Sequence, residues 1–124
     1  MKLHADPQQS ALNTVTAYGA GFIEVNRQRH PGAVLLMPEG PVRPWGVANV
    51  AAIDEAVVRQ LAEMAAEVVL IGTGERQQLL HPRVLRALLG AGVGVDAMDT
   101  RAACRTYNIL MAEGRKVLAA LMPI

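Results

Sequence analysis

The sequence predicts an α/β fold, a single-domain three-layer sandwich with a mixed central sheet, from its size, its apolar runs and their order. The chain has 124 residues, of which 52% are apolar and 19% charged, a composition typical of one compact soluble domain. Continuous apolar runs such as 33–37 and 68–71 are typical of strands buried on both faces. In the second half these runs alternate with segments of helical periodicity. We therefore expect a β-rich N-terminal half followed by the order α-β-α-β-α-β.

The first half is expected to contain strands and turns only. Its clearest signal is Gly19-Ala20-Gly21, which lies between two short extended runs and predicts a hairpin. The polar residues 27–30 are expected to turn, and the three prolines within 38–44 predict a backbone that is irregular or edge-like. Residues 1–12 show no clear period, so we expect a loosely ordered segment there and the domain itself at residues 13–124. The strands expected in this half are residues 14–18, 22–26, 33–37 and 45–47.

The second half is expected to contain three helices between strands. Asp54 predicts the start of a helix that runs to about Ala66, because an aspartate before a helix accepts bonds from its free N–H groups. Pro82 suits the first turn of a second helix, which reaches Gly90. Thr100 is expected to cap the third helix, and Gly114 to end it. The expected strands are residues 68–71, 93–98 and 116–122, and the direction of the last is left open.

Composition restricts the class of partner and the location. The net charge of +1 provides no general field for nucleic acid, so no nucleic-acid partner is expected. No apolar run approaches the roughly 20 residues that cross a bilayer, and the first residues lack the apolar core of a signal peptide. A cytoplasmic protein without a membrane span is therefore expected. The single cysteine, Cys104, excludes an internal disulfide and a metal site of several cysteines, and neither a metal nor a cofactor is expected.

Three sequence blocks together indicate a family. They are Tyr-Gly-Ala-Gly-Phe at 18–22 with Val25-Asn26, Leu-Ile-Gly-Thr-Gly at 70–74, and Met-Asp-Thr-Arg-Ala-Ala-Cys-Arg-Thr-Tyr-Asn at 98–108 followed by Glu113-Gly114-Arg115. In this order they resemble the adipogenesis-associated Mth-domain family, which includes a mitochondrial assembly factor for respiratory complex I. The resemblance covers the chain from about Asn13 to Ile124. It implies a compact three-layer fold with a mixed central sheet and, for function, the binding of partner proteins during complex assembly.

The candidate site lies where two predicted strands end. Carboxyl ends of parallel strands meet at one edge of a sheet, so the Gly72-Thr73-Gly74 loop and the start of the third helix should share a rim. On the helical wheel Ala103, Tyr107, Leu110 and Met111 form one face, which we expect to be core. The opposite face carries Arg101, Arg105 and Asn108. The candidate anion- or partner-binding residues are Thr73, Gly74, Arg101, Cys104, Arg105 and Asn108.

Arg101 and Arg105 need a negative partner, because cations are disfavoured at a helix start and repel one another at this spacing. One interpretation is a structural network, the commoner arrangement, in which an internal carboxylate neutralises both arginines. The other is an external anion, such as a phosphate or a partner's acidic side chain, held by the guanidinium forks. The candidate internal carboxylates are Asp96, Asp99, Glu75 and Glu113.

Three further residues each have two interpretations. Cys104 is either a thiol with a lowered pKa at a helix start or, more commonly for a free cysteine, a small buried residue. His81 before Pro82 is expected to be a capping or surface residue rather than a ligand. Trp45 is either an exposed anchor for a partner or a large residue buried under the proline-rich loop.

No catalytic constellation is complete in this sequence, and no phosphate-binding or dinucleotide-binding motif is present. We therefore predict a soluble, non-enzymatic protein-interaction or complex-assembly factor whose protein partner and oligomeric state are left open. The alternative is a small-molecule or anion-binding protein, or an enzyme, that uses the rim. Catalytic residues are not assigned.

Overall fold

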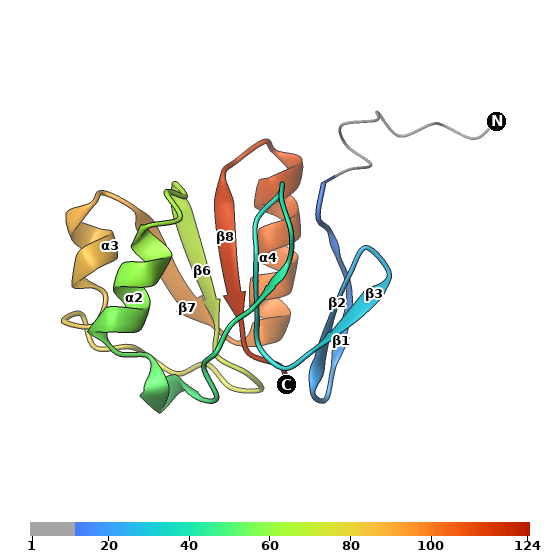
Figure 1. The fold of residues 1–124 in the computed structure, drawn as a ribbon, viewed down its shortest axis with the longest axis horizontal. Coiled ribbons are helices and arrows are strands. Elements are labelled where there is room, and N and C mark those ends of the chain that lie inside the picture. Colours follow the sequence, from blue (N-terminus) through green and yellow to red (C-terminus); the bar gives the residue numbers. More distant parts are fainter. Residues whose placement is uncertain (1–11) are drawn as a thin grey trace.

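A computed structural model describes residues 12–124 of the chain, and the expected loose segment at 1–12 lies outside the described residues apart from Leu12. The described part folds into strands and helices in an order close to the expected one (Figure 1). The elements are β1 (Val15–Gly19), β2 (Phe22–Val25), β3 (Gln28–Pro31), β4 (Val34–Leu36), β5 (Arg43–Pro44), η1 (Val50–Ala52), α2 (Glu55–Ala62), β6 (Val68–Gly72), α3 (Arg86–Gly90), β7 (Gly94–Met98), α4 (Thr100–Ala112) and β8 (Val117–Leu121).

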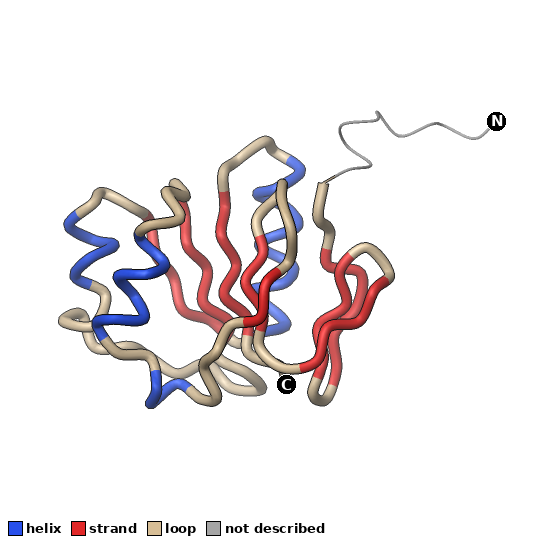
Figure 2. Tube along the Cα trace, viewed as in Figure 1, coloured by secondary structure: helices blue, strands red, loops and turns tan. Residues whose placement is uncertain are grey.

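The strands form two sheets (Figure 2). The larger is mixed and has the order β5-β4-β8-β6-β7, while β1, β2 and β3 form a separate antiparallel sheet. The last strand, β8, runs parallel to β6 and antiparallel to β4, which settles its direction. In Figure 1, α2 and α3 lie to the left of β8, and α4 and the small sheet lie to its right. The predicted three-layer α/β sandwich with a mixed central sheet is confirmed.

Strand β8 lies at the centre of both hydrophobic cores, since every residue from Val117 to Leu121 is fully buried. Its side chains alternate between the two faces of the sheet, as they must in a strand. Val117, Ala119 and Leu121 join the core under α4 and the small sheet, called here the α4 core. Leu118 and Ala120 join the core under α2 and α3, called here the α2–α3 core.

Residues 27–30 do not form the expected turn. Gln28–Pro31 is strand β3, paired with β2, and the turn lies one step earlier at Asn26-Arg27. Both turn residues have positive φ, 51° and 69°, which is the backbone of a two-residue hairpin turn that matches strand twist. The sequence of β3 shows no alternation of apolar and polar residues that could predict a strand. The strand lies at an edge of the small sheet and is held there by backbone hydrogen bonds to β2.

Three other elements differ from expectation by more than one residue. Residues 45–47 are not a strand, and the short β5 lies at Arg43–Pro44 instead. Helix α2 ends at Ala62, before Ala65 takes a positive φ of 56°. Helix α3 begins only at Arg86, because the residues after Pro82 form successive turns. Trp45 is 6% exposed and lies in the α2–α3 core, which confirms its interpretation as a buried residue.

The helix ends follow the expected chemistry with one exception. Asp54 Oδ1 accepts a hydrogen bond from the Val57 N–H at 2.9 Å, as predicted for the α2 cap. The α4 cap is Asp99, which accepts from the Ala102 N–H at 3.0 Å, and Thr100 is the first residue inside the helix. Gly114 ends α4 with a φ of 83°, and its N–H donates to the Met111 carbonyl at 3.0 Å.

Candidate functional site

The predicted rim forms at the carboxyl edge of the central sheet. Strands β6 and β7 are parallel neighbours, and Gly72 at the end of β6 lies opposite Met98 at the end of β7. The start of α4 closes onto the loop after β6, since the Thr100 N–H donates to the Gly74 carbonyl at 2.8 Å. The predicted proximity of the loop after β6 and the start of α4 is therefore confirmed.

The Thr100 side chain connects the segments of the rim by hydrogen bonds. Its hydroxyl accepts a hydrogen bond from the Gly74 N–H at 2.8 Å and donates to the Met122 carbonyl at 2.6 Å. The side chain is fully buried, so one hydroxyl joins the loop after β6, the start of α4 and the end of β8. Gly72 is packed against the same residue: a Cβ built there would lie 2.9 Å from Thr100 Oγ1.

Thr73 is also used internally. Its N–H donates to the Met98 carbonyl at 2.8 Å, and its hydroxyl lies 2.6 Å from the carbonyl oxygen of Arg76. The same hydroxyl accepts from the Gln78 N–H at 3.1 Å, and the residue is 3% exposed. The N–H groups of Thr73 and Gly74, which an anion cradle needs, thus already donate within the protein. The geometry gives both residues a structural role, and their part in ligand binding stays a prediction.

Arg101 and Arg105 both lie exposed on α4. Within residues 12–124, no carboxylate comes within the 4.0 Å of an ion pair with either guanidinium, whereas Arg115 pairs with Glu67 at 2.6 Å. For the described part of the chain, the interpretation that an internal carboxylate neutralises the two arginines is therefore wrong. Ile109, four residues beyond Arg105, is 60% exposed. Arg101, Arg105 and Ile109 form one row along α4, called here the α4 row.

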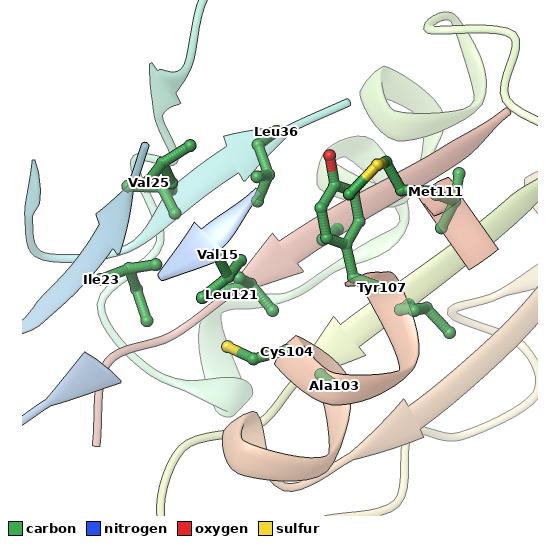
Figure 3. Close-up of a cluster of buried hydrophobic side chains, with 13 residues drawn as sticks. Val15, Ile23, Val25, Leu36, Ala103, Cys104, Tyr107, Met111 and Leu121 are labelled. Carbon is green, nitrogen blue, oxygen red and sulfur yellow. The ribbon is translucent and has the colours of Figure 1, made fainter. Parts of the chain in front are cut away.

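Cys104 is a buried core residue. It is 1% exposed and packs in the α4 core, near Ala103 and Val15 (Figure 3). Burial raises the pKa of its thiol to about 12, an effect that the charge of Arg105 opposes only in part. The expected alternative of a small buried residue is confirmed, and the alternative of a lowered thiol pKa is wrong.

Asn108 and Tyr107 join α4 to the small sheet. Asn108 Oδ1 accepts from the Val15 N–H and its Nδ2 donates to the Val15 carbonyl, both at 2.9 Å. The buried Tyr107 hydroxyl donates to the Asn13 carbonyl at 2.8 Å. The expected core face of α4 is otherwise as predicted: Ala103, Tyr107 and Met111 are buried (Figure 3). The Asn108 amide thus has a structural task, and its part in partner binding stays a prediction.

Two concave regions lie away from the rim and have no counterpart in the sequence analysis. One is a cleft of about 560 Å³ whose lining includes Met37, Met64 and Met111. The other lies over the start of α3 and is lined by Arg83 and Arg86. The lining of the first region comes from distant parts of the chain, whereas the second joins residues within 81–90 to Glu55 and Arg59 of α2. His81, the expected cap or surface residue, is exposed, and its Nδ1 accepts from the Arg83 N–H at 3.0 Å.

The described residues contain neither a metal-binding cluster nor a membrane-spanning helix. Between residues 12 and 124, no group of three histidine, cysteine or acidic side chains is arranged to hold a metal ion. In the same range, no helix combines the length and apolarity that crossing a membrane requires.

Comparison with known proteins places the chain in a family. A sequence profile described as protein of unknown function (DUF498/DUF598) matches residues 15–122. The chain is 37% identical to the NADH dehydrogenase (ubiquinone) 1 alpha subcomplex assembly factor 3 of Bos taurus over 111 residues, 88% of this chain and 60% of the relative. The Homo sapiens protein of the same name is 35% identical over the same shares of the two chains. The chain thus spans less than two thirds of the length of these relatives.

Solved structures agree with this assignment. A crystal structure from Bordetella parapertussis is 58% identical with a TM-score of 0.87, covering 92% of this chain and 98% of that one. An Mth938-like domain from Bordetella pertussis, solved by NMR, is 48% identical with a TM-score of 0.84, covering 99% and 92%. The chain therefore belongs to the DUF498/DUF598 family of Mth938-like domains, which confirms the resemblance carried by its three sequence blocks.

Proposed function

We propose that this protein is a non-enzymatic complex-assembly factor that acts by binding partner proteins through the α4 row. The relatives at 37% and 35% identity are named as assembly factors of NADH dehydrogenase, which supports a role in assembling a protein complex. The observation that carries the proposal is the α4 row itself. Two arginines without an ion pair in residues 12–124 lie beside Ile109, a large apolar side chain that is 60% exposed.

The chemistry of the row suits a protein partner. Arginine is enriched in the centres of interfaces, and these centres are more apolar than the polar rim that surrounds them. The guanidinium fork binds a carboxylate through two parallel hydrogen bonds. A partner that supplies one or two carboxylates and a pocket for Ile109 would therefore neutralise the arginines and cover the exposed side chain.

Single substitutions in the row test the proposal. Tagged protein is recovered from cells that express it at native level, and stoichiometric partners are quantified by mass spectrometry. Arg105→Glu and Ile109→Glu should each reduce recovery of the same partner by about tenfold or more. A glutamate at position 105 would repel the partner's carboxylate, and a glutamate at position 109 would place a charge in an apolar contact. Arg76→Glu, an exposed arginine outside α4, is the matched control and should leave recovery unchanged.

Two results would contradict the proposal. In the first, no stoichiometric partner is recovered with the unmodified chain; in the second, both α4 variants retain the partner. Thermal unfolding of each purified variant accompanies the recovery, so that loss of binding is separated from loss of fold. All three positions are exposed, where substitutions change stability by about 0.5 kcal/mol or less.

The alternative function, anion binding at the rim, has less support. The N–H groups of Thr73 and Gly74 donate to Met98 and Thr100, so a phosphate at the rim would have to break these bonds. A thermal-shift measurement with inorganic phosphate checks this point. An anion held at 100 times its dissociation constant would add about 2.7 kcal/mol of stability, and we expect no such shift.

A further inference from the structure

A second group of arginines lies on the opposite side of the central sheet from α4. Arg59 belongs to α2, and Arg83 and Arg86 belong to the turn and helix of α3, which packs against α2. All three are exposed. Two adjoining concave surfaces of about 580 and 380 Å³ share Arg83 and Arg86 as lining residues. Together these residues form one basic depression, called here the α2–α3 surface.

The α2–α3 surface carries an excess of positive charge. Among its lining residues, Glu55 is the single carboxylate against three arginines. None of the three guanidinium groups forms an ion pair with any other residue of the range 12–124. Each fork therefore keeps its hydrogen-bond donors free for an external carboxylate.

Apolar groups lie directly beside these charges. Leu89 is 51% exposed and lines the same depression as Arg83 and Arg86, together with Pro82. A half-exposed leucine side chain is stabilised when another apolar side chain covers it, because apolar surface is removed from water. A free inorganic anion would use the arginines and leave Leu89 exposed, whereas a peptide segment can satisfy both.

We propose that the α2–α3 surface binds an acidic segment of a partner protein, with carboxylates on Arg59, Arg83 and Arg86 and an apolar side chain against Leu89. The inference rests on the proposed function in one respect, namely that the occupant is a partner protein. It concerns a different surface, however, because α4 and the α2–α3 pair cover opposite faces of the sheet (Figure 1). An assembly factor with both surfaces holds two partner segments at the same time.

A synthetic peptide tests the surface without knowledge of the natural partner. The probe is a fluorescein-labelled peptide of alternating glutamate and leucine, and binding to the full chain is followed by fluorescence anisotropy at about 0.1 M salt. Arg83→Gln/Arg86→Gln should raise the dissociation constant by about tenfold or more, because both depressions lose the guanidinium hydrogen-bond donors that they share. Leu89→Ser should raise the dissociation constant by a smaller factor.

The matched control is Arg27→Gln/Arg76→Gln, which removes two exposed arginines that belong neither to the α2–α3 surface nor to the α4 row. It should change the dissociation constant by no more than about twofold if the peptide binds at the α2–α3 surface. Equal weakening by the two double variants would mean non-specific attraction and would overturn the proposal, as would the absence of binding to the unmodified chain. Thermal unfolding checks that each variant is folded.

An all-glutamate peptide of the same length tests the apolar contact. The proposal expects weaker binding of this probe, since it offers nothing to Leu89. Equal affinity of the two peptides would mean that the surface attracts negative charge without an apolar contact. It would overturn the proposal that the bound segment places an apolar side chain against Leu89. These outcomes are distinguishable from a failure of the α4 row, which is read from Arg105, Ile109 and a natural partner.

Discussion

Gly72 and Thr100 are packed so closely at the rim that a larger side chain at Gly72 would not fit. The Thr100 hydroxyl connects the Gly74 N–H to the Met122 carbonyl, and Gly72 supplies the space for it. The requirement at Gly72 is steric rather than conformational, because no positive φ occurs there. In the Gly-Thr-Gly block that helps to identify the family, packing thus explains Gly72, whereas a φ of 94° explains the glycine at Gly74.

Gly72→Ala should destabilise the fold by about 1–3 kcal/mol, the usual cost of forcing an extra methyl group into a packed site. The new Cβ would meet Thr100 Oγ1 at 2.9 Å, Leu121 Cδ2 at 3.0 Å and the Thr100 backbone at 3.2 Å. Urea denaturation measures the loss. Gly90→Ala is the control, because open space surrounds a Cβ there and the change should be neutral or stabilising by up to about 1 kcal/mol. An equal effect of both changes would contradict the steric account.

Cys104 should be unreactive while the protein is folded. Burial keeps its thiol protonated, so iodoacetamide at pH 8 should alkylate the native chain at least about tenfold more slowly than the chain in urea. Comparable rates in the two states would show that the thiol is accessible.

The same burial gives a pH dependence of a definite sign. The pKa of Cys104 is raised from its ordinary value near 9 to about 12, so the folded state holds a proton that the unfolded state releases. This stabilising contribution is complete below pH 9 and is lost as pH rises from 9 towards 12. Burial raises the pKa of Tyr107 as well, so the unmodified chain is compared with Cys104→Ala. The variant should lose less stability between pH 8 and 10.

At the scale of elements, α4 combines two faces with different tasks. Its inner face joins the small sheet through Asn108 and Tyr107, and its outer face carries the α4 row. The helical period predicted this division for the apolar positions and for Arg101 and Arg105. It was wrong for Asn108, which it placed on the outer face with the two arginines and which instead contacts β1. It could not predict that Asn108 binds Val15, because the two residues are 93 positions apart in the chain. Long-range hydrogen bonds of this kind leave no local signal.

Asn108→Ala should loosen the small sheet more than the central one. The two bonds to Val15 are lost, which costs about 1–3 kcal/mol where backbone groups lose their partners. Hydrogen exchange should therefore accelerate in β1 and β2 more than in β6. Arg105→Ala, on the exposed face of the same helix, is the control and should leave exchange in β1 unchanged. A uniform acceleration through both sheets would count against a local joint.

Elements were predictable wherever apolar residues carried the period. Strands β4, β6, β7 and β8 all follow apolar runs, and Asp54 marked the start of α2. Strand β3 was missed because its residues, Gln28 to Pro31, have no apolar alternation and are held through backbone pairing with β2. At α4, Asp99 and Thr100 are both good capping residues, and tertiary packing of the Thr100 hydroxyl decides between them.

For the whole molecule, β8 makes the two cores interdependent. Its residues are fully buried and point alternately into the α4 core and the α2–α3 core. A strand that belongs to both cores cannot leave one of them without disrupting the other, so residues 12–124 should unfold cooperatively. The sequence indicated a buried last strand, but its central position depends on strand order, which apolar runs do not specify.

Leu121→Ala tests this coupling with two optical probes. Leu121 lies in the α4 core, whereas Trp45, the single tryptophan of the chain, lies in the α2–α3 core. Removing a buried leucine side chain costs about 2–5 kcal/mol. If the cores unfold together, the urea midpoint from Trp45 fluorescence should fall by as much as the midpoint from far-UV circular dichroism. Ile109→Ala, on the exposed α4 row, should change the free energy of unfolding by a few tenths of a kcal/mol at most, as measured by either probe. A Trp45 transition that stays in place while the dichroism transition moves would show that the α2–α3 core is stable by itself, and β8 would not couple the two layers.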